Sequence, residues 1–425
     1  MTLNKYKFNL LLFVIFTFYF VHLSYAQSGW IQQTSGITSK INAVYFENSQ
    51  TGWSVGDSGK IIKTTNGGTN WYLINSGTFK NLNSLSFNSS NNAFIVGDSG
   101  IVLNTTNGGN NWNYSNFPNH NYFFNTVVFV NDSIGYIGGT PDDFFSISKV
   151  FKTSNGGDSW DSLSSEASFV KAIYFINPVI GWIIQGYNAV GVQHISKTID
   201  GGLNWTIQFS NSSLNTVFFY NILNGWTSGY GSGFNVYKST NGGNNWIPCL
   251  FCGLNPVHSF FFTDSLKGWG ASEDGIIHTT NAGTNWIVQN SSHPLVTYNS
   301  IYFNDSLTGW VVGDSGIILK TTTGGVLTNF ANTSSEIPDK YYLSQNYPNP
   351  FNPVTNLEFG IPDLGFVSLK VYDVSGKEVV VLLNEKLSPG RYKTEFNGNN
   401  FPSGVYFMIM ESGDFRDIKR MVLIK

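Results

Sequence analysis

The sequence predicts an all-β fold: a seven-bladed β-propeller closed by an N-terminal strand and followed by a small C-terminal β-sandwich. An octapeptide of the form TTNGGTNW recurs six times, with tryptophans at 71, 112, 160, 205, 246 and 286. The spacings of 40 to 48 residues match the period of a four-stranded propeller blade. The 425 residues are 16% aromatic and 12% charged and include 45 Gly. This composition is typical of short strands joined by many turns.

The first segment of the chain is expected to be a signal peptide, residues 1–26. Lys5 and Lys7 precede an apolar run at 8–20, and Ala26 ends a small-residue cleavage site. Because this run is shorter than the roughly 20 residues that cross a bilayer, no transmembrane segment is expected in the mature chain. In an exported protein, Cys249 and Cys252 form a possible disulfide or remain two free thiols.

Four strands are expected in each blade. The second strand opens with a pair such as Gly52-Trp53, the third runs into the octapeptide, and the fourth starts at its tryptophan. The recurring GDSG between second and third strands is interpreted as a hairpin turn and not as a protease nucleophile, because it repeats at one blade position. The first strands are expected at 41–46, 82–87, 124–129, 170–175, 214–219, 257–262 and 298–303.

The octapeptide is interpreted as a hairpin turn, because Asn and Gly tolerate positive φ angles. The Thr64 hydroxyl and the Asn66 amide are expected to bond backbone groups of the turn, and Trp71 to pack on neighbouring strands. The corresponding structural residues are Thr64, Asn66, Gly68, Trp71, Asn107, Trp112, Asn155, Trp160, Asp200, Trp205, Asn241, Trp246, Asn281 and Trp286.

These residues resemble the Asp-box (BNR-like) signature known from sialidases, sortilin-type receptors and the propellers of photosystem II assembly factors. Asn replaces the Asp of that signature in every copy but one, where Asp200 is kept. The resemblance implies that the octapeptide is a structural hairpin lying away from the active face.

The seventh copy of the octapeptide has Thr328 where the tryptophan is expected. Trp30 lies 41 residues before Trp71, so the segment around it has the spacing of a missing fourth strand. Pairing the two ends of the propeller removes exposed sheet edges. The propeller is therefore expected to span 27–326 and to be closed by this segment.

Residues 327–340 are expected to be a linker, and 341–425 a small β-sandwich of alternating strands. The segments QNYPNPFNP, SGVYFMIM and KRMVLIK resemble the type A C-terminal sorting domain of the Por (type IX) secretion system. The resemblance implies export to the periplasm, recognition by an outer-membrane translocon, and tail removal with release or surface attachment. The alternative is a sandwich module that binds an extracellular ligand.

Charge and motifs restrict the function. The net charge of −3 does not favour a nucleic-acid partner. The only arginines, Arg391, Arg416 and Arg420, lie in the tail, so the propeller lacks the arginine cluster of a sialidase. No metal-binding or nucleotide-binding motif is present in the sequence, and no cofactor, metal ligand or catalytic residue is assigned.

Two function classes remain: a non-enzymatic propeller that binds an extracellular glycan or protein, which we favour, and a secreted glycoside hydrolase. The hydrolase would use paired carboxylates on the propeller face. The available acids are Asp57, Asp98, Asp142, Asp143, Asp274, Asp314 and Glu273.

The binding surface is expected where the repeats are lengthened, between the second and third strands of blades three, four and five. Insertions confined to one face of a repeat protein commonly form its binding surface. Alanine at Phe144, Tyr187 and Tyr230 together is expected to abolish binding without loss of stability. The candidate ligand-binding residues are Asp142, Asp143, Phe144, Phe145, Tyr187, Asn188, Tyr230 and Phe234.

Overall fold

The structure is a computed structural model of the chain. It describes residues 29–115, 117, 121–143, 146–164, 167–187, 191–230, 235–249, 255–273, 275–289, 296–325, 331–334, 337–387, 389–399 and 401–425. The predicted signal peptide and Cys252 lie outside the described residues. Cys249 is disulfide-bonded.

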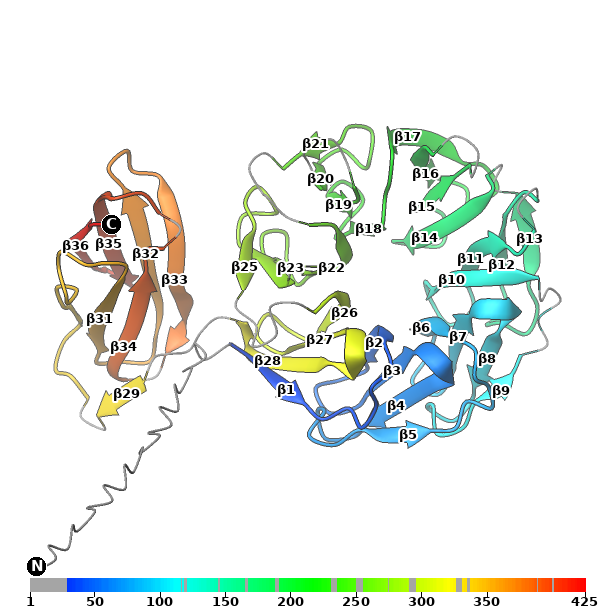
Figure 1. The fold of residues 1–425 in the computed structure, drawn as a ribbon, viewed down its shortest axis with the longest axis horizontal. Helices are drawn as coiled ribbons and strands as arrows, with labels where there is room; N and C mark the ends of the chain where they lie inside the picture. Colours follow the sequence, from blue (N-terminus) through cyan, green and yellow to red (C-terminus); the bar gives the residue numbers. More distant parts are fainter. Residues whose placement is uncertain are drawn as a thin grey trace, which may run out of the picture.

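The strands from β1 to β28 form seven four-stranded antiparallel sheets arranged in a ring, which confirms the predicted propeller (Figure 1). The first strands line the centre of the ring. They are β2 (Ile41–Phe46), β6 (Leu82–Phe87), β10 (Tyr122–Phe129), β14 (Phe169–Phe175), β18 (Thr216–Phe219), β22 (Val257–Phe262) and β26 (Tyr298–Phe303). The second strands are β3 (Gly52–Gly56), β7 (Ala93–Gly97), β11 (Gly135–Pro141), β15 (Gly181–Gly186), β19 (Gly225–Ser228), β23 (Gly268–Ser272) and β27 (Gly309–Gly313).

The third strands lead into the octapeptide, and the fourth strands form the rim. The third strands are β4 (Lys60–Thr64), β8 (Val102–Thr105), β12 (Lys149–Thr153), β16 (Gln193–Thr198), β20 (Val236–Ser239), β24 (Gly275–Thr279) and β28 (Ile318–Gly325). The fourth strands are β5 (Tyr72–Ile74), β9 (Asn113–Tyr114), β13 (Asp161–Ser164), β17 (Thr206–Asn211), β21 (Ile247–Pro248), β25 (Ile287–Gln289) and β1 (Gly29–Gln33). We number the sheets blade 1 to blade 7 in the order of their first strands.

Blade 7 combines the two ends of the propeller, because β1 pairs antiparallel with β28. Trp30 of β1 is buried and meets the Phe303 ring edge-on, with centroids 5.8 Å apart. Trp71 meets Phe46 of blade 1 in the same way, also at 5.8 Å. Trp30 therefore takes the place of the tryptophan missing from the seventh octapeptide, as predicted from its spacing.

Aromatic rings also join each blade to the next. Phe46, at the end of β2, stacks on Trp310 of blade 7 with ring centroids 3.5 Å apart. A Cβ atom at Gly52 would come within 2.5 Å of the Phe46 ring, which explains why glycine opens this second strand. Each such interface buries large apolar rings, so the repeat supplies the propeller core.

The GDSG motif forms the hairpin turn that the sequence predicts: β3 and β4 pair antiparallel up to Gly56 and Lys60, with a short turn of 3₁₀ type between them. The three copies are η1 (Asp57–Gly59), η2 (Asp98–Gly100) and η3 (Asp314–Gly316). Ser58 has φ 58° and Gly59 has φ 69°, so two successive left-handed residues reverse the chain. The sequence therefore predicts this chain reversal correctly.

The C-terminal part is a β-sandwich of two four-stranded sheets, as predicted. One sheet has the order β29-β34-β31-β30 and the other β33-β32-β35-β36. Their bounds are β29 (Ala331–Ser334), β30 (Tyr342–Leu343), β31 (Val354–Ile361), β32 (Gly365–Asp373), β33 (Glu378–Leu387), β34 (Gly390–Asn397), β35 (Gly404–Ser412) and β36 (Phe415–Leu423). Strand β29 lies within 327–340, so part of the expected linker belongs to a sheet.

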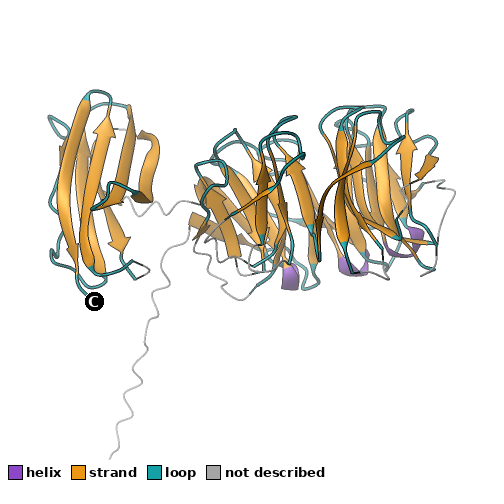
Figure 2. Ribbon diagram, turned by 90° about the horizontal axis from the view of Figure 1, so that it is seen from above, coloured by secondary structure: helices purple, strands orange, loops and turns teal. Residues whose placement is uncertain are grey.

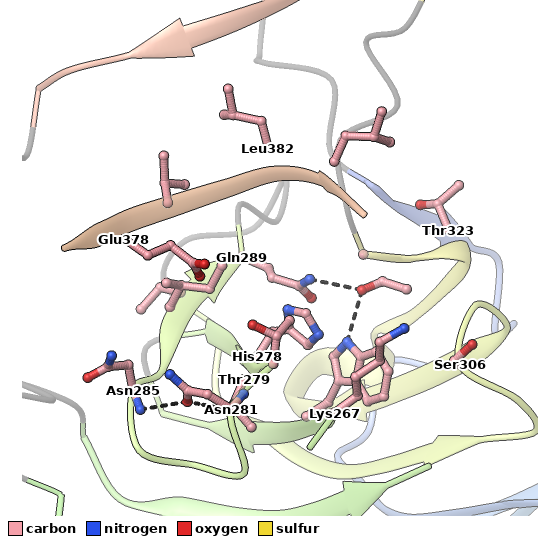
Figure 3. Close-up of a pocket in the computed structure, with 18 of the residues that line it drawn as sticks. Lys267, His278, Thr279, Asn281, Asn285, Gln289, Ser306, Thr323, Glu378 and Leu382 are labelled. Carbon is pink, nitrogen blue, oxygen red and sulfur yellow. Dashed lines mark hydrogen bonds between the residues drawn. The ribbon is translucent and has the colours of Figure 1, made fainter. Parts of the chain in front are cut away.

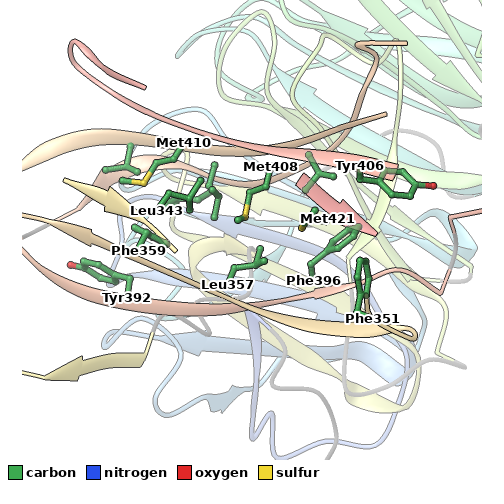
Figure 4. Packing of buried hydrophobic residues seen from close by; sticks show 14 of the residues in the cluster. Leu343, Phe351, Leu357, Phe359, Tyr392, Phe396, Tyr406, Met408, Met410 and Met421 are labelled. Carbon is green, nitrogen blue, oxygen red and sulfur yellow. The ribbon is translucent and has the colours of Figure 1, made fainter. Parts of the chain in front are cut away.

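The sandwich has its own hydrophobic core, in which Leu357, Phe359, Met408 and Met410 are fully buried (Figure 4). The QNYPNPFNP segment lies along the end of β36. Asn349 Oδ1 accepts a hydrogen bond from the backbone N–H of Val422, at 2.9 Å. The segment thus protects backbone groups of the edge strand β36.

Candidate ligand-binding face

The propeller has two faces with different connections. We call one the octapeptide face: it carries the loops between third and fourth strands and between first and second strands, joined by the bond from Gly67 N to Gln50 O at 2.7 Å. We call the other the link face: it carries the connections between second and third strands and those between blades, joined by the bond from Asp57 N to Lys40 O at 2.9 Å. The 3₁₀ turns mark the link face in Figure 2.

On the octapeptide face, Thr and Asn side chains hold the loop as the sequence predicts. Thr64 Oγ1 accepts from the backbone N–H of Gly68 at 2.8 Å and donates to Asn66 Oδ1 at 3.0 Å. Asn66 Oδ1 also accepts from the N–H of Asn70 at 2.9 Å. The same bonds recur around Thr105, Thr153, Thr198, Ser239 and Thr279.

The octapeptide loop also joins neighbouring blades. Trp310 Nε1 and Lys320 Nζ of blade 7 both donate to the carbonyl of Gly67 in blade 1, at 3.2 and 2.9 Å. The Lys320 ammonium lies 5.2 Å from the centre of the Trp310 ring. We call this arrangement of aromatic, lysine and turn carbonyl the latch. It recurs with Tyr136 and Lys152, and with Trp182 and Lys197.

On the link face, seven side chains occupy one position at the start of the first strands. We call them the inner ring: Asn42, Asn83, Asn125, Lys171, Asn215, His258 and Asn299. Asn42 Nδ2 donates to the Leu82 carbonyl of the next blade and to Asp57 Oδ1, both at 2.9 Å. The asparagines of blades 2, 3 and 7 likewise donate to carbonyls of the following blade.

The inner ring changes character in blades 4 to 6. Lys171 replaces asparagine in blade 4 and donates to Asn215 Oδ1 at 2.6 Å. His258 replaces it in blade 6, and its Nε2 lies 3.7 Å from Glu273 Oε1. Tyr230, from the lengthened loop of blade 5, donates its hydroxyl to the same Glu273 oxygen. Burial is the main cause that lowers the pKa of His258. The negative charges of Glu273 and Asp314 raise this pKa, whereas the positive charges of Lys40 and Lys171 lower it.

The predicted ligand-binding residues are only partly described. Asp142 and Asp143 follow β11, Tyr187 follows β15, and Tyr230 follows β19, all on the link face. Tyr187 is 42% exposed and Tyr230 is 50% exposed, so both rings are open to a partner. The structure brings Tyr230 together with Glu273. Phe144, Phe145, Asn188 and Phe234 lie outside the described residues.

Sequence reasoning missed the inner ring and one exposed aromatic residue. Aligning INAVYF with the other first strands puts Asn42 and its six equivalents in one column, which was the available signal. Phe79, in the connection between blades 1 and 2, is 92% exposed on the link face. The repeat gives no signal for it, because the corresponding residue before blade 1 is Thr38.

Three of the carboxylates considered for hydrolysis have structural partners. Asp57, Asp98 and Asp314 each accept a hydrogen bond from the inner-ring asparagine of their own blade. Asp274 lies outside the described residues. Within the described ranges, no group of three His, Cys, Asp or Glu residues is arranged to hold a metal ion.

A cavity of about 310 Å³ lies between the sandwich and blades 6 and 7 (Figure 3). Its wall includes His278, which stacks on Trp269 at a centroid distance of 4.8 Å and replaces the latch lysine of blade 6. Burial lowers the pKa of His278 to about 4, and the charge of Lys267 acts in the same direction. The residues predicted to bind ligand do not line this cavity.

The ring of four-stranded sheets, its latches and the separate sandwich define a β-propeller protein with a C-terminal β-sandwich domain. The sequence matches the model of the photosynthesis system II assembly factor YCF48 family at residues 23–117 and 70–242. These matches together span more than half of the chain, which therefore belongs to this family. Residues 345–425 match the secretion system C-terminal sorting domain, which indicates export to the cell surface or the medium.

Solved structures share the fold at low sequence identity. A structure described as YCF48 bound to D1 peptide is 18% identical, with a TM-score of 0.56 over 70% of this chain and 98% of its own. PorZ, a surface component of the type IX secretion system of Porphyromonas gingivalis, is 12% identical (TM-score 0.54; 90% and 59% coverage). A GH74 enzyme of Niastella koreensis is 13% identical (TM-score 0.55; 78% and 59%).

The curated proteins contain no match to the sequence. No helix among the described residues is long and apolar enough to cross a membrane.

Proposed function

We propose that the chain is an exported, non-enzymatic binding protein whose propeller binds a peptide segment of a partner on the link face. The observation that carries this proposal is the loss of repetition there: the loops of blades 3 to 5 are lengthened and expose Tyr187 and Tyr230. Exposed aromatic rings beside polar groups are typical of protein recognition surfaces. The peptide complex of the YCF48 structure supports a peptide as the ligand class.

The octapeptide face offers less to a ligand. Its amides, hydroxyls and lysines bond turn backbone within and between blades, as Thr64 and Lys320 do. Such groups are already satisfied, so a ligand that bonded them would have to replace existing contacts. This argues for the link face.

The alternative is a glycoside hydrolase, supported by the likeness in fold to GH74 enzymes. Hydrolysis requires two carboxylates on opposite sides of the scissile bond, one of them a general acid. Asp57, Asp98 and Asp314 repeat the same bond to asparagine in three blades, which is the pattern of a structural turn. We therefore favour binding.

The binding proposal is tested with the propeller and its sorting domain on arrays of peptides and glycans, with turnover of the glycans measured in parallel. Tyr187→Ala combined with Tyr230→Ala is expected to weaken peptide binding at least tenfold. Tyr72→Ala, at a ring equally exposed on the rim strand β5, is the matched control. Glycan turnover that disappears on replacing a link-face carboxylate would instead establish the hydrolase.

The sorting role is tested in a bacterium with a type IX system. Replacing 419–425, which include the end of β36, is expected to leave a folded propeller trapped in the periplasm, because the sandwich core is separate from the blades. The control is Val374→Ala, at an exposed turn of the sandwich. Normal surface delivery after replacement of 419–425 would contradict the proposed role.

A further inference from the structure

Lys171 carries a half-buried ammonium group of the inner ring that has no acidic partner in the described part of the structure. Its Nζ donates to Asn215 Oδ1 at 2.6 Å, and no salt bridge joins it to an acid among the described residues. Desolvation by burial lowers its pKa, and no acid among the described residues raises it again. A partly desolvated positive charge of this kind is stabilised by an anion.

Two further nitrogen atoms of the inner ring have no hydrogen-bond partner within the described part of the chain: one belongs to Asn215, which accepts from Lys171, and the other to His258, whose pKa the charge of Lys171 lowers. These are Asn215 Nδ2 and His258 Nε2, although both atoms are shielded from solvent. Lysine can only donate, so the oxygen of Asn215 must face Lys171 and its NH₂ group must be directed elsewhere. His258 Nε2 lies 3.7 Å from Glu273, which is too far for a hydrogen bond.

The same ring position is satisfied in the other blades. Asn42, Asn83, Asn125 and Asn299 each donate to a backbone carbonyl of the following blade. Within the inner ring, the two unpaired nitrogens therefore lie in blades 5 and 6, next to Lys171 of blade 4 and to the loop that carries Tyr230. Buried polar groups in proteins are nearly always hydrogen-bonded, so unpaired ones mark a place where a ligand can supply the partner.

We propose that Lys171, Asn215 and His258 form a binding site for a carboxylate group. A carboxylate supplies the negative charge that Lys171 lacks and has enough acceptor positions for all three donors. Uncharged acceptors would leave the ammonium without a counter-charge. Glu273 does not fill this role: it lies beside His258 and accepts the Tyr230 hydroxyl.

This inference deepens the proposed function, because it names the group by which a link-face ligand would be held. The carboxylate can belong to a peptide or to an acidic sugar. The observations favour a peptide, since exposed tyrosines border the site and the related YCF48 structure holds a peptide. An acidic sugar is the other outcome of the test.

The site is tested by NMR titration of full-length mature protein labelled with ¹³C in its histidine rings, using sodium acetate as the probe. We expect a saturable shift of the His258 signal at millimolar acetate. N-acetylglycine should bind and N-acetylglycinamide should not, while glucuronate compared with glucose tests the sugar source. Glucuronate binding tighter than N-acetylglycine would move the assignment from peptide to sugar.

The decisive variant is Lys171→Asn, which installs the residue that five of the seven blades carry at this position and so should preserve folding. We expect its acetate dissociation constant to rise at least tenfold, with an unchanged melting temperature. Lys80→Asn removes an exposed lysine of the same face and should leave acetate binding unchanged. Equal binding by wild type and Lys171→Asn, or no shift of His258 in wild type, would overturn the carboxylate site.

The failure of this site and the failure of the proposed function give different results. If acetate shifts His258 but the arrays yield no peptide, the carboxylate site stands and the proposed function fails. If a peptide binds through Tyr187 and Tyr230 but acetate leaves His258 unchanged, the proposed function stands and the carboxylate site fails.

Discussion

The two faces of the propeller carry the same repeat and use it differently. On the octapeptide face, the recurring threonine and asparagine side chains have recurring partners, and the latch of Trp310, Lys320 and the Gly67 carbonyl recurs in other blades, although the indole N–H groups of five octapeptide tryptophans have no hydrogen-bond partner among the described residues. On the link face, the asparagines of the inner ring follow the same rule until blades 4 to 6, where Lys171 and His258 depart from it. A polar side chain that recurs with the same hydrogen-bond partner in many blades indicates a structural role. A position where this pattern is lost is a candidate for ligand binding.

The largest effect is expected at the closure of the ring. Trp30→Ala removes a fully buried ring that meets Phe303 and donates to Gln289 Oε1 at 2.9 Å. Such a change typically costs about 3–5 kcal/mol of unfolding free energy. The control is Ile31→Ala in the same strand, where the side chain is 68% exposed. Urea unfolding of both variants is followed by tryptophan fluorescence. Equal urea midpoints for the two variants would show that the buried Trp30 ring does not stabilise the closure of the propeller.

The next effect concerns His278, whose pKa is lowered to about 4 by burial, with a smaller contribution from Lys267. An unfolded histidine has a pKa near 6.5, so between these values the unfolded chain binds a proton that the folded chain does not. The contribution of neutral His278 to the free energy of unfolding is therefore fully present above about pH 6.5. It is lost as the pH falls toward 4, and the total loss is about 3 kcal/mol.

The measurement for His278 is the unfolding free energy at pH 7 and pH 4.5 in wild type and His278→Gln. The glutamine variant should lose less stability on acidification, because it has no group to protonate. Parallel acid profiles of the two proteins would assign the loss to other residues.

A smaller effect is expected inside a single octapeptide loop. Thr64→Val keeps the shape of the side chain but removes the hydroxyl that accepts from the N–H of Gly68. Leaving a buried donor unpaired costs about 1–3 kcal/mol. Thr69→Val, at an exposed hydroxyl of the same loop, is the control. A thermal melt in which both variants match wild type would show that the loop is held by its backbone alone.

The smallest effect is expected on the link face. Lys40 lies 4.0 Å from Asp314, with both side chains about half exposed. Exposed ion pairs contribute about 0–1 kcal/mol, so Lys40→Ala should change the unfolding free energy little. A loss above about 2 kcal/mol, measured by urea unfolding at two salt concentrations, would show that this face is also structural.

The sequence predicted the features that its own repetition encodes. The spacing of Trp30 to Trp71 located the closing strand, and the recurring Thr64 and Asn66 located the loop contacts. The partner of Lys320 was not predictable, because the Gly67 carbonyl lies 253 residues away in the chain. Hydrogen bonds between blades depend on how the sheets are arranged around the ring, and the local sequence pattern does not predict this arrangement.

For the candidate site, the sequence located the lengthened loops but not their neighbours. Tyr230 was named from its place in an insertion, whereas its contact with Glu273 depends on the angle between blades 5 and 6. Lys171 was not predicted as a site residue, although it stands in a column of the first strands where five blades carry asparagine. Its significance comes from the Asn215 oxygen beside it, which only the folded ring supplies.

The pairing of β1 with β28 also sets the order in which the propeller can be completed. Synthesis starts at the N-terminal end, so β1 has to wait for a partner strand almost 290 residues further along the chain. Contacts this distant in sequence slow folding, and an unpaired strand edge is prone to pair with another chain. The final step of propeller assembly is therefore the pairing of β1, which is synthesised first, with β28 of blade 7, which is synthesised last. A chain interrupted before β28 leaves β1 without its partner strand.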